Sequence, residues 1–313
     1  MSGDEREELR RGTAYGFLAY AIWGVFPLYF AALKPAGAWE ILAHRIVWTL
    51  VFCAVILLVR RDLVWARQLV ARPRLAGGVT LAALLIATNW VIYVFAVLTG
   101  RTTEAALGYF LNPIVTVALG VVVLRERLRP LQWAAVAIGA VAGVYLSVVG
   151  GQFPLIALSL AFSFAAYGLV KKKVGASLDA MHSLAAETAV LFPVAVVVLV
   201  ALGVGGGTTF TQDVPLHPAL LLVAGVVTAV PLLLFAAAAR RIPLTTVGLL
   251  QFITPVLQLL CGVLLLDEHM STARWVGFGI VWVALLVLTV DMLADRQGRR
   301  RRFASSVIEE PAP

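Results

Sequence analysis

Long apolar stretches recur along nearly the whole chain and limit what it can fold into. Each is about 20 residues long and rich in aliphatic and aromatic side chains, as a membrane-spanning helix requires. Membrane-spanning strands would instead be shorter and alternate polar with apolar residues. We therefore predict an all-α membrane protein with ten transmembrane helices, at 13–33, 38–59, 75–98, 103–123, 131–149, 152–170, 181–203, 217–238, 243–265 and 273–293.

The composition supports a protein that is embedded in a lipid bilayer. Hydrophobic residues make up 61% of the chain and charged residues 13%, whereas soluble proteins carry about 25% charged residues. The formal net charge of +8 does not indicate nucleic acid, because the basic residues cluster between apolar stretches, where they set topology. Cys53 and Cys261 both lie inside apolar stretches, so neither a disulfide framework nor a metal site is expected. No cofactor is expected either.

The basic residues also predict the orientation, because Lys and Arg favour the cytoplasmic loops of membrane proteins. With the ten stretches above, 21 of the 25 Lys and Arg residues fall on one side and three on the other, while Arg45 lies within a helix. Both termini are therefore predicted to be cytoplasmic. A short N-terminal segment (1–12) precedes the first helix, and a basic, polar tail (294–313) that we expect to be disordered follows the last.

An internal duplication relates the two halves of the chain. Four pairs of distinctive residues are each separated by 142 positions, a match that apolar composition alone does not produce. The first repeat is predicted to cover 13–149 and the second 152–293, with five helices each. The matched pairs are Pro113 and Pro255, Gly120 and Gly262, Glu126 and Glu268, and Trp133 and Trp275.

An odd number of helices in each repeat means that the second repeat enters the membrane from the opposite side. The loops at the matched glutamates agree, since Glu126 is flanked by arginines and Glu268 is not. Inverted repeats are a common plan among secondary transporters, whose binding sites lie at the repeat interface near the midplane. The longest outer loop (203–218) is rich in Gly and Thr and is expected to be a flexible tether.

Ionisable side chains inside a membrane are costly and are candidate functional groups by default. Glu40, His44 and Arg45 lie together in the second stretch, and Glu40 and His44 share a helix face. Glu187, in the seventh stretch, follows Arg45 by 142 residues, so these two occupy equivalent positions. Their depths argue against a direct salt bridge. We predict that both border one central cavity; the alternative is that each is a structural charge with local partners.

Other intramembrane side chains are candidate substrate contacts, although such groups also join helices simply by hydrogen bonds. Pro113 and Pro255 each remove a backbone hydrogen bond and are candidate hinges, or else only shape the packing. Glu104 is expected to cap its own helix, and Lys171 to set topology. The candidate contacts are Asn89, Trp90, Tyr93, Tyr109, Asn112 and Gln251.

Several sequence blocks resemble one group of permeases. They include Glu40-Ile41-Leu42-Ala43-His44-Arg45 and Gly108-Tyr109-Phe110-Leu111-Asn112-Pro113, and the similarity covers almost the whole chain. The group is the RarD-type permeases of the EamA family, in the drug/metabolite transporter superfamily, often labelled chloramphenicol-sensitive proteins. Thr254 departs from the family pattern, which has a glycine before Pro255. The resemblance implies ten helices, two EamA repeats, a bacterial inner-membrane location and transport of small metabolites or drugs.

The sequence thus predicts a secondary active transporter that works by alternating access, with a small-molecule substrate and the lipid bilayer as partners. Proton coupling through Glu187, Glu40 or His44 is one option, because a desolvated carboxylate can titrate near neutral pH, and a homodimer is compatible with this interpretation. The alternative is a non-transporting sensor or assembly protein, which the lack of a sizeable soluble domain disfavours. An enzyme is not expected, since the chain has no H-E-x-x-H or G-x-S-x-G motif.

Overall fold

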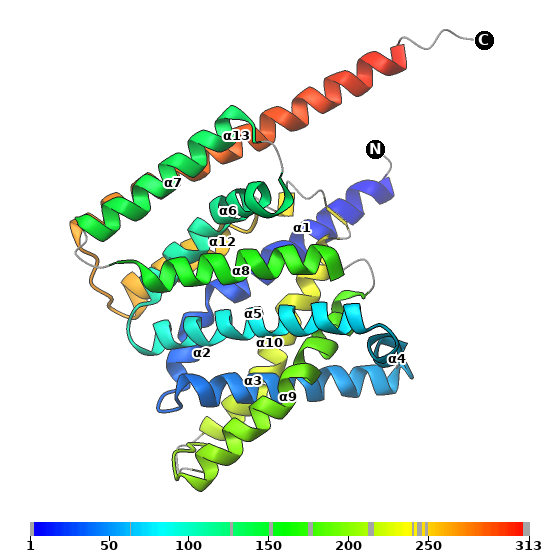
Figure 1. The fold of residues 1–313 in the computed structure, drawn as a ribbon, viewed down its shortest axis with the longest axis vertical. Coiled ribbons are helices and arrows are strands. Elements are labelled where there is room, and N and C mark those ends of the chain that lie inside the picture. Colours follow the sequence, from blue (N-terminus) through cyan, green and yellow to red (C-terminus); the bar gives the residue numbers. More distant parts are fainter. Residues whose placement is uncertain are drawn as a thin grey trace.

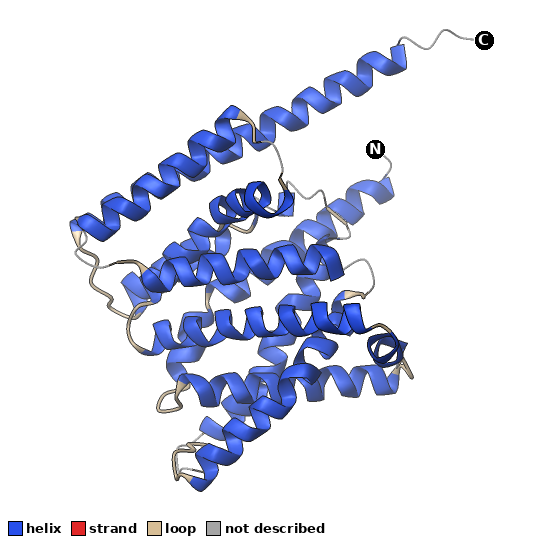
Figure 2. Ribbon diagram, viewed as in Figure 1, coloured by secondary structure: helices blue, strands red, loops and turns tan. Residues whose placement is uncertain are grey.

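The protein folds into a bundle of helices (Figure 1). The computed structural model describes residues 3–62, 64–125, 128–149, 153–174, 178–211, 216–239, 241–242, 246–247 and 250–308; Glu126 lies outside these ranges. Within them no strand is present (Figure 2). The elements are α1 (Gly3–Gly24), α2 (Phe26–Ala32), α3 (Ala38–Val59), α4 (Val64–Ala71), α5 (Pro73–Leu98), α6 (Thr102–Leu124), α7 (Pro130–Val148), α8 (Leu155–Val174), α9 (Ala180–Val204), α10 (His217–Ala239), α12 (Ile253–Leu260), the π-helix η1 (Cys261–Leu265) and α13 (Thr272–Ile308).

These helices confirm the all-α membrane fold expected from the sequence. Eight of them are long and apolar enough to cross a membrane, and the apolar helices Leu155–Lys171 and Ile253–Leu265 are shorter. All ten expected stretches thus correspond to apolar helices, while the count of ten complete crossings stays a prediction. Large apolar side chains such as Val144, Val197 and Leu286 are exposed on the outside of the bundle, as expected for a surface that contacts lipid.

Two of the expected helices are interrupted. Val25 separates α1 from α2, and its backbone leaves the helical conformation (φ −94°, ψ 3°). Pro27 lies just beyond this break and has no N–H to give to the carbonyl group of residue 23. The ninth expected stretch breaks at Gln251–Phe252, in a turn directly before α12. Breaks at this depth are tolerated where neighbouring helices satisfy the freed backbone groups.

Helix packing shows that the two halves are related by a pseudo-two-fold axis. In this relation α1 corresponds to α8, α5 to α10, and α6 to α12. When equivalent helices are exchanged, the contact of α6 with α8 becomes the contact of α12 with α1, and the contact of α5 with α8 becomes the contact of α10 with α1. In the same way, α10 packs on α3 as α5 packs on α9. Three pairs of equivalent helices also pack on each other, namely α3 with α9, α6 with α12, and α7 with α13. Every one of these contacts maps onto another, or onto itself, when the halves are exchanged.

Equivalent helices run in opposite directions, because the start of one contacts the end of the other. Glu40, at the start of α3, bonds the loop that follows α9. Glu268, which follows η1, bonds the first residues of α6. Arg129, directly before α7, pairs with Asp291 of α13. The repeats are therefore antiparallel to each other, as the sequence predicted.

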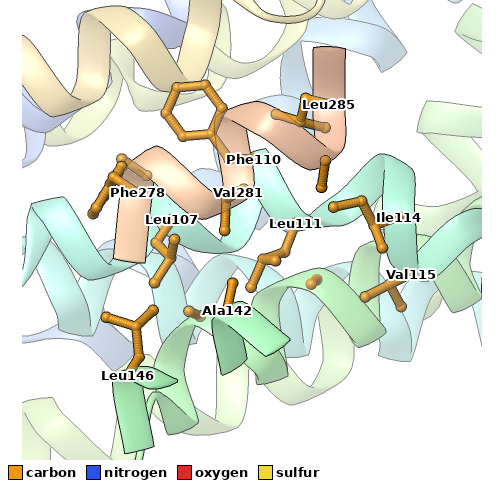
Figure 3. Close-up of a cluster of buried hydrophobic side chains, with 14 of the residues drawn as sticks. Leu107, Phe110, Leu111, Ile114, Val115, Ala142, Leu146, Phe278, Val281 and Leu285 are labelled. Carbon is orange, nitrogen blue, oxygen red and sulfur yellow. The ribbon is translucent and has the colours of Figure 1, made fainter. Parts of the chain in front are cut away.

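Close packing between the repeats depends on small residues and on a shared apolar core. A Cβ atom on Gly225 of α10 would lie 2.2 Å from the backbone carbon of Trp48 on α3, so only glycine permits this approach. The largest core cluster joins α6, α7, α8, α12 and α13, and Figure 3 shows part of it. In it Phe110 and Phe278 meet edge to face, with ring centroids 6.0 Å apart.

Two expectations differ from the structure. The tail after Asp295 was expected to be disordered, but α13 continues to Ile308, and both chain ends lie at the same end of the bundle (Figure 1). The outer loop was expected to be a flexible tether, but Thr209 is buried against α3. The carboxylate of Glu40 supplies the acceptor that fixes this part of the loop.

Candidate functional site

Arg45 of α3 is buried between two aromatic rings. Its Cζ atom lies 4.4 Å from the ring centroid of Trp90 on α5 and 5.1 Å from that of Phe30 on α2. Its Nε donates a hydrogen bond of 3.1 Å to Thr228 Oγ1 on α10. The guanidinium thus lies between helices of both repeats, where cation–π contacts replace part of its lost hydration.

Tyrosine side chains extend this aromatic cluster. The Tyr93 ring lies 5.9 Å from Phe30 and 5.6 Å from Tyr109, between centroids. The Tyr93 hydroxyl is buried and has no hydrogen-bond partner among the described residues. The Tyr93 ring thus connects the Phe30 ring beside Arg45 to the ring of Tyr109. The structure thus brings four predicted site residues together: Arg45, Trp90, Tyr93 and Tyr109.

Asn89 joins helices and orients one of these tyrosines. Its Nδ2 donates to Leu160 O and Ser163 Oγ on α8, both at 3.0 Å. Its Oδ1 accepts a hydrogen bond of 3.2 Å from the Tyr109 hydroxyl. These bonds make Asn89 an interhelical contact that positions Tyr109.

Glu187 lies in a separate polar cluster near the end of the bundle that holds both termini. Its carboxylate pairs with Lys171 Nζ at 2.5 Å and accepts bonds from Ser183 Oγ at 3.0 Å and Tyr167 OH at 3.2 Å. Lys171 therefore does more than set topology. Arg45 and Glu187 form no ion pair with each other, in keeping with their different depths, and the central cavity that they were expected to border stays a prediction.

Glu40 and His44 lie toward the opposite end of the bundle, against the loop between α9 and α10. Glu40 accepts bonds from Thr209 N at 2.7 Å and Thr209 Oγ1 at 2.9 Å, and from Thr208 Oγ1 at 3.0 Å. The His44 ring stacks on Phe210, with centroids 5.1 Å apart. Its Nδ1 lies 3.2 Å from Trp48 Nε1, while its Nε2 is buried and has no partner among the described residues.

Two more buried glutamates at this end satisfy the first turns of helices. Glu268 accepts bonds from the backbone N–H groups of Thr102 (2.5 Å) and Thr103 (2.8 Å) on α6. Glu104 was expected to cap its own helix, but its Oε1 accepts from Ile156 N at the start of α8. A carboxylate at a helix N-terminus is favoured by the free N–H groups and the helix dipole.

The remaining predicted residues lie along the matched helices. Asn112 is buried on α6 and accepts a 3.5 Å contact from Thr116. Pro113 lies inside α6, which continues through it, whereas Pro255 follows the break at Gln251. The two prolines therefore have different backbone surroundings in the two repeats, and their role as hinges stays a prediction.

The sequence did not predict a set of contacts at the α1 break. Two side chains of α12 and the first side chain of η1 bond carbonyl groups at the end of α1: Thr254 Oγ1 to Tyr20 O at 2.8 Å, Gln258 Nε2 to Trp23 O at 3.1 Å, and Cys261 Sγ to Gly24 O at 3.8 Å. Their i, i+4, i+7 spacing was visible in the sequence, but nothing in the sequence indicated which carbonyls Pro27 left free.

Comparison with known proteins agrees with the two-repeat arrangement of the helices. The model of the EamA-like transporter family matches residues 10–149 and 153–290. The chain belongs to this family. "Protein RarD" of Streptomyces exfoliatus is 47% identical over 308 residues, which cover 97% of each chain. An "Uncharacterized transporter" of Pseudomonas aeruginosa is 43% identical, over 90% of this chain and 94% of its own.

A solved crystal structure shares the fold of this chain, with a TM-score of 0.59 at 18% identity, over 89% of this chain and 97% of the other. The family model and the relatives show that this EamA protein is a RarD-type permease, a multi-pass bacterial membrane transporter. Among its described residues, no group of three or more His, Cys, Asp or Glu side chains could hold a metal ion. Arg45 and its aromatic neighbours are the candidate contacts for a transported molecule.

Proposed function

We propose that this protein is a secondary active transporter that moves a small metabolite or drug-like molecule across the bacterial inner membrane by alternating access, without changing it covalently. The observation that carries the proposal is the antiparallel pairing of equivalent helices around α3 and α9, with buried charges at equivalent positions. Inverted repeats of this kind place a binding site at their interface and allow one repeat to rock against the other.

Polar links join the two repeats at both ends of the bundle. At the end opposite the termini, Glu40 bonds Thr209 and Glu268 bonds Thr102. At the end with the termini, His182 Nε2 lies 3.0 Å from Asp62 Oδ2, and Arg129 Nη2 lies 2.5 Å from Asp291 Oδ2. Rocking in one direction would break the first pair of links and keep the second. A substrate favours this exchange only if it binds the two conformations differently.

Two equivalent alanines provide a test of alternating access. Ala43 on α3 and Ala185 on α9 are buried and occupy matched positions near opposite ends of the bundle. Ala43→Cys and Ala185→Cys are made separately in a background with Cys53→Ala and Cys261→Ser. Reaction with a soluble thiol reagent then reports how open each end is.

Breaking the links at one end should change the reaction rates of the two thiols in opposite directions. With Glu40→Ala and Glu268→Ala, the thiol at position 43 should react faster and the thiol at 185 more slowly. With Asp62→Ala and His182→Ala, the order should reverse. If both thiols respond in the same direction in both backgrounds, the bundle loosens without alternating, and a non-transporting scaffold is the better interpretation. Uptake driven by an applied pH gradient in proteoliposomes tests coupling to protons, the option that the sequence offers.

A further inference from the structure

Arg45 differs from every other buried charge among the described residues. Glu104, Glu187 and Asp291 each pair with a cation, and Glu40 and Glu268 accept N–H or O–H bonds on both oxygens. Arg45 is 3% exposed and forms no ion pair with a carboxylate of the described residues. It is thus a buried cation that no carboxylate among the described residues neutralises.

A buried charge without a partner is costly, and the contacts present meet only part of that cost. The rings of Phe30 and Trp90 attract the guanidinium through their faces. However, these rings accept no hydrogen bond from the N–H groups, which point outward in the plane of the guanidinium. A guanidinium has five N–H donors, and the bond to Thr228 uses only Nε.

Donors without a partner in the described part of the chain therefore lie on two helices, beside the same aromatic ring. The Nη1 and Nη2 groups of Arg45 on α3 form no hydrogen bond to the described residues. The buried Tyr93 hydroxyl on α5 has no partner among them either. Tyr93 and Arg45 both lie against the ring of Phe30. The chemical group that would satisfy both is an acceptor with a negative charge.

We propose, on the basis of the transport function proposed above, that Arg45 binds a carboxylate group of the transported molecule. A carboxylate matches the guanidinium fork and can accept two parallel N–H bonds. A carboxylate carries one negative charge, which one arginine balances. A phosphate dianion would leave one negative charge unbalanced. The aromatic rings around Arg45 favour an apolar or aromatic body next to the carboxylate. Because Arg45 is buried in this conformation, the molecule reaches it only when the repeats move apart.

The charge class of the transported molecules tests this proposal without knowledge of the substrate. Proteoliposomes that contain the full-length protein are mixed with a deproteinised bacterial extract, and their contents are measured by mass spectrometry at short times against protein-free liposomes. Molecules that enter through the protein are expected to carry a carboxylate. Arg45→Gln should reduce their entry at least about tenfold, because loss of a desolvated charged partner weakens binding by more than that.

Arg241→Gln is the matched control. This arginine also lies over an aromatic ring, that of Tyr15 at 5.6 Å, but it pairs with Glu8 at the surface, and entry should stay within about twofold of wild type. Tyr93→Phe keeps the ring and removes the unpartnered hydroxyl, and should reduce entry about three- to tenfold. If Arg45→Gln does not fold, two results still decide the test. They are the entry rate with Tyr93→Phe and the charge class of the molecules that the wild type admits.

The possible failures are distinguishable. If the molecules admitted by the wild type are neutral or cationic, or if Arg45→Gln is present in the liposomes and admits carboxylates at the wild-type rate, the carboxylate assignment is wrong and the transport function stands. If no molecule of any charge enters faster than in protein-free liposomes, the proposed function fails, and the assignment fails with it.

Discussion

Arg125 and Asp267 have the same left-handed backbone conformation, with φ of 53° in each. They are 142 residues apart in the sequence, so they occupy equivalent positions in the two repeats. Arg125 follows α6, where its N–H bonds Gly120 O, and Asp267 comes shortly after η1. The two repeats thus end this helix in the same way, although α6 is one continuous α-helix and α12 continues into the π-helix η1. Both side chains are exposed, which makes this pair a reporter of topology.

The first prediction concerns the side of the membrane on which each residue lies. In a background with Cys53→Ala and Cys261→Ser, Arg125→Cys and Asp267→Cys are treated with a membrane-impermeant thiol reagent in intact cells. Only the Asp267→Cys protein should react, because the antiparallel repeats place the two positions on opposite sides and the basic loop at Arg125 stays in the cytoplasm. After the cells are opened, both should react. Reaction of both in intact cells would contradict the inverted arrangement.

The second prediction concerns the strain of the left-handed conformation. Glycine adopts a positive φ without a Cβ clash, whereas other residues pay about 1 kcal/mol or more. Arg125→Gly should therefore stabilise the protein by about 0.5–1 kcal/mol, and Asp267→Gly by less, because Asp tolerates this region better than Arg. Thermal unfolding in detergent measures both. Arg60→Gly is the matched control, since Arg60 also ends a helix but has φ of −78°, and no gain is expected there.

The sequence predicted the helical fold well because the bilayer imposes it. Length and apolarity placed the expected helix at 38–59 on the same residues as α3, and the 142-residue offset found the repeat. The breaks were harder to predict. The stretch around Val25 is as apolar as its neighbours, and Pro27 alone does not reveal whether a helix bends or stops. Whether Pro113 and Pro255 interrupt their helices depends on the helices packed beside them, which no local pattern reports.

The candidate site was predicted in part, for a related reason. Costly groups such as Arg45 and Glu187 stand out in an apolar chain, but their partners come from distant segments. Trp90 is a candidate because of its polar neighbours, while Phe30 and Thr228 resemble ordinary lipid-facing or packing residues. Lys171 opens a run of lysines, a pattern that indicates topology. Its pairing with Glu187 depends on the packing of α9 against the end of α8.

The third prediction concerns that pair. Lys171→Met should destabilise the protein by about 2–4 kcal/mol, because the Glu187 carboxylate, 5% exposed, is left buried without its cation. Adding Glu187→Gln should recover most of the loss, since a neutral amide needs no counter-charge. Thermal unfolding of the wild type, both single variants and the double variant measures the coupling. Lys34→Met, at an exposed loop position, should change stability little. Additive effects of the two substitutions would show that the pair contributes nothing beyond its separate parts.

The fourth prediction concerns the α1 break, where Gln258 Nε2 donates to the Trp23 carbonyl 3.1 Å away. Pro27 cannot supply the N–H that this carbonyl would accept in a continuous helix. Gln258→Leu should therefore cost about 1–3 kcal/mol, the penalty for an unsatisfied buried acceptor. Pro27→Ala restores an N–H at the right position, so in that background Gln258→Leu should cost less than half as much. Thr254→Val is the matched control, because its acceptor, the Tyr20 carbonyl, lies within α1, where the helix supplies a donor. Equal costs of Gln258→Leu in both backgrounds, measured by thermal unfolding, would mean that Gln258 stabilises the protein through packing and not by replacing the hydrogen bond that proline removes.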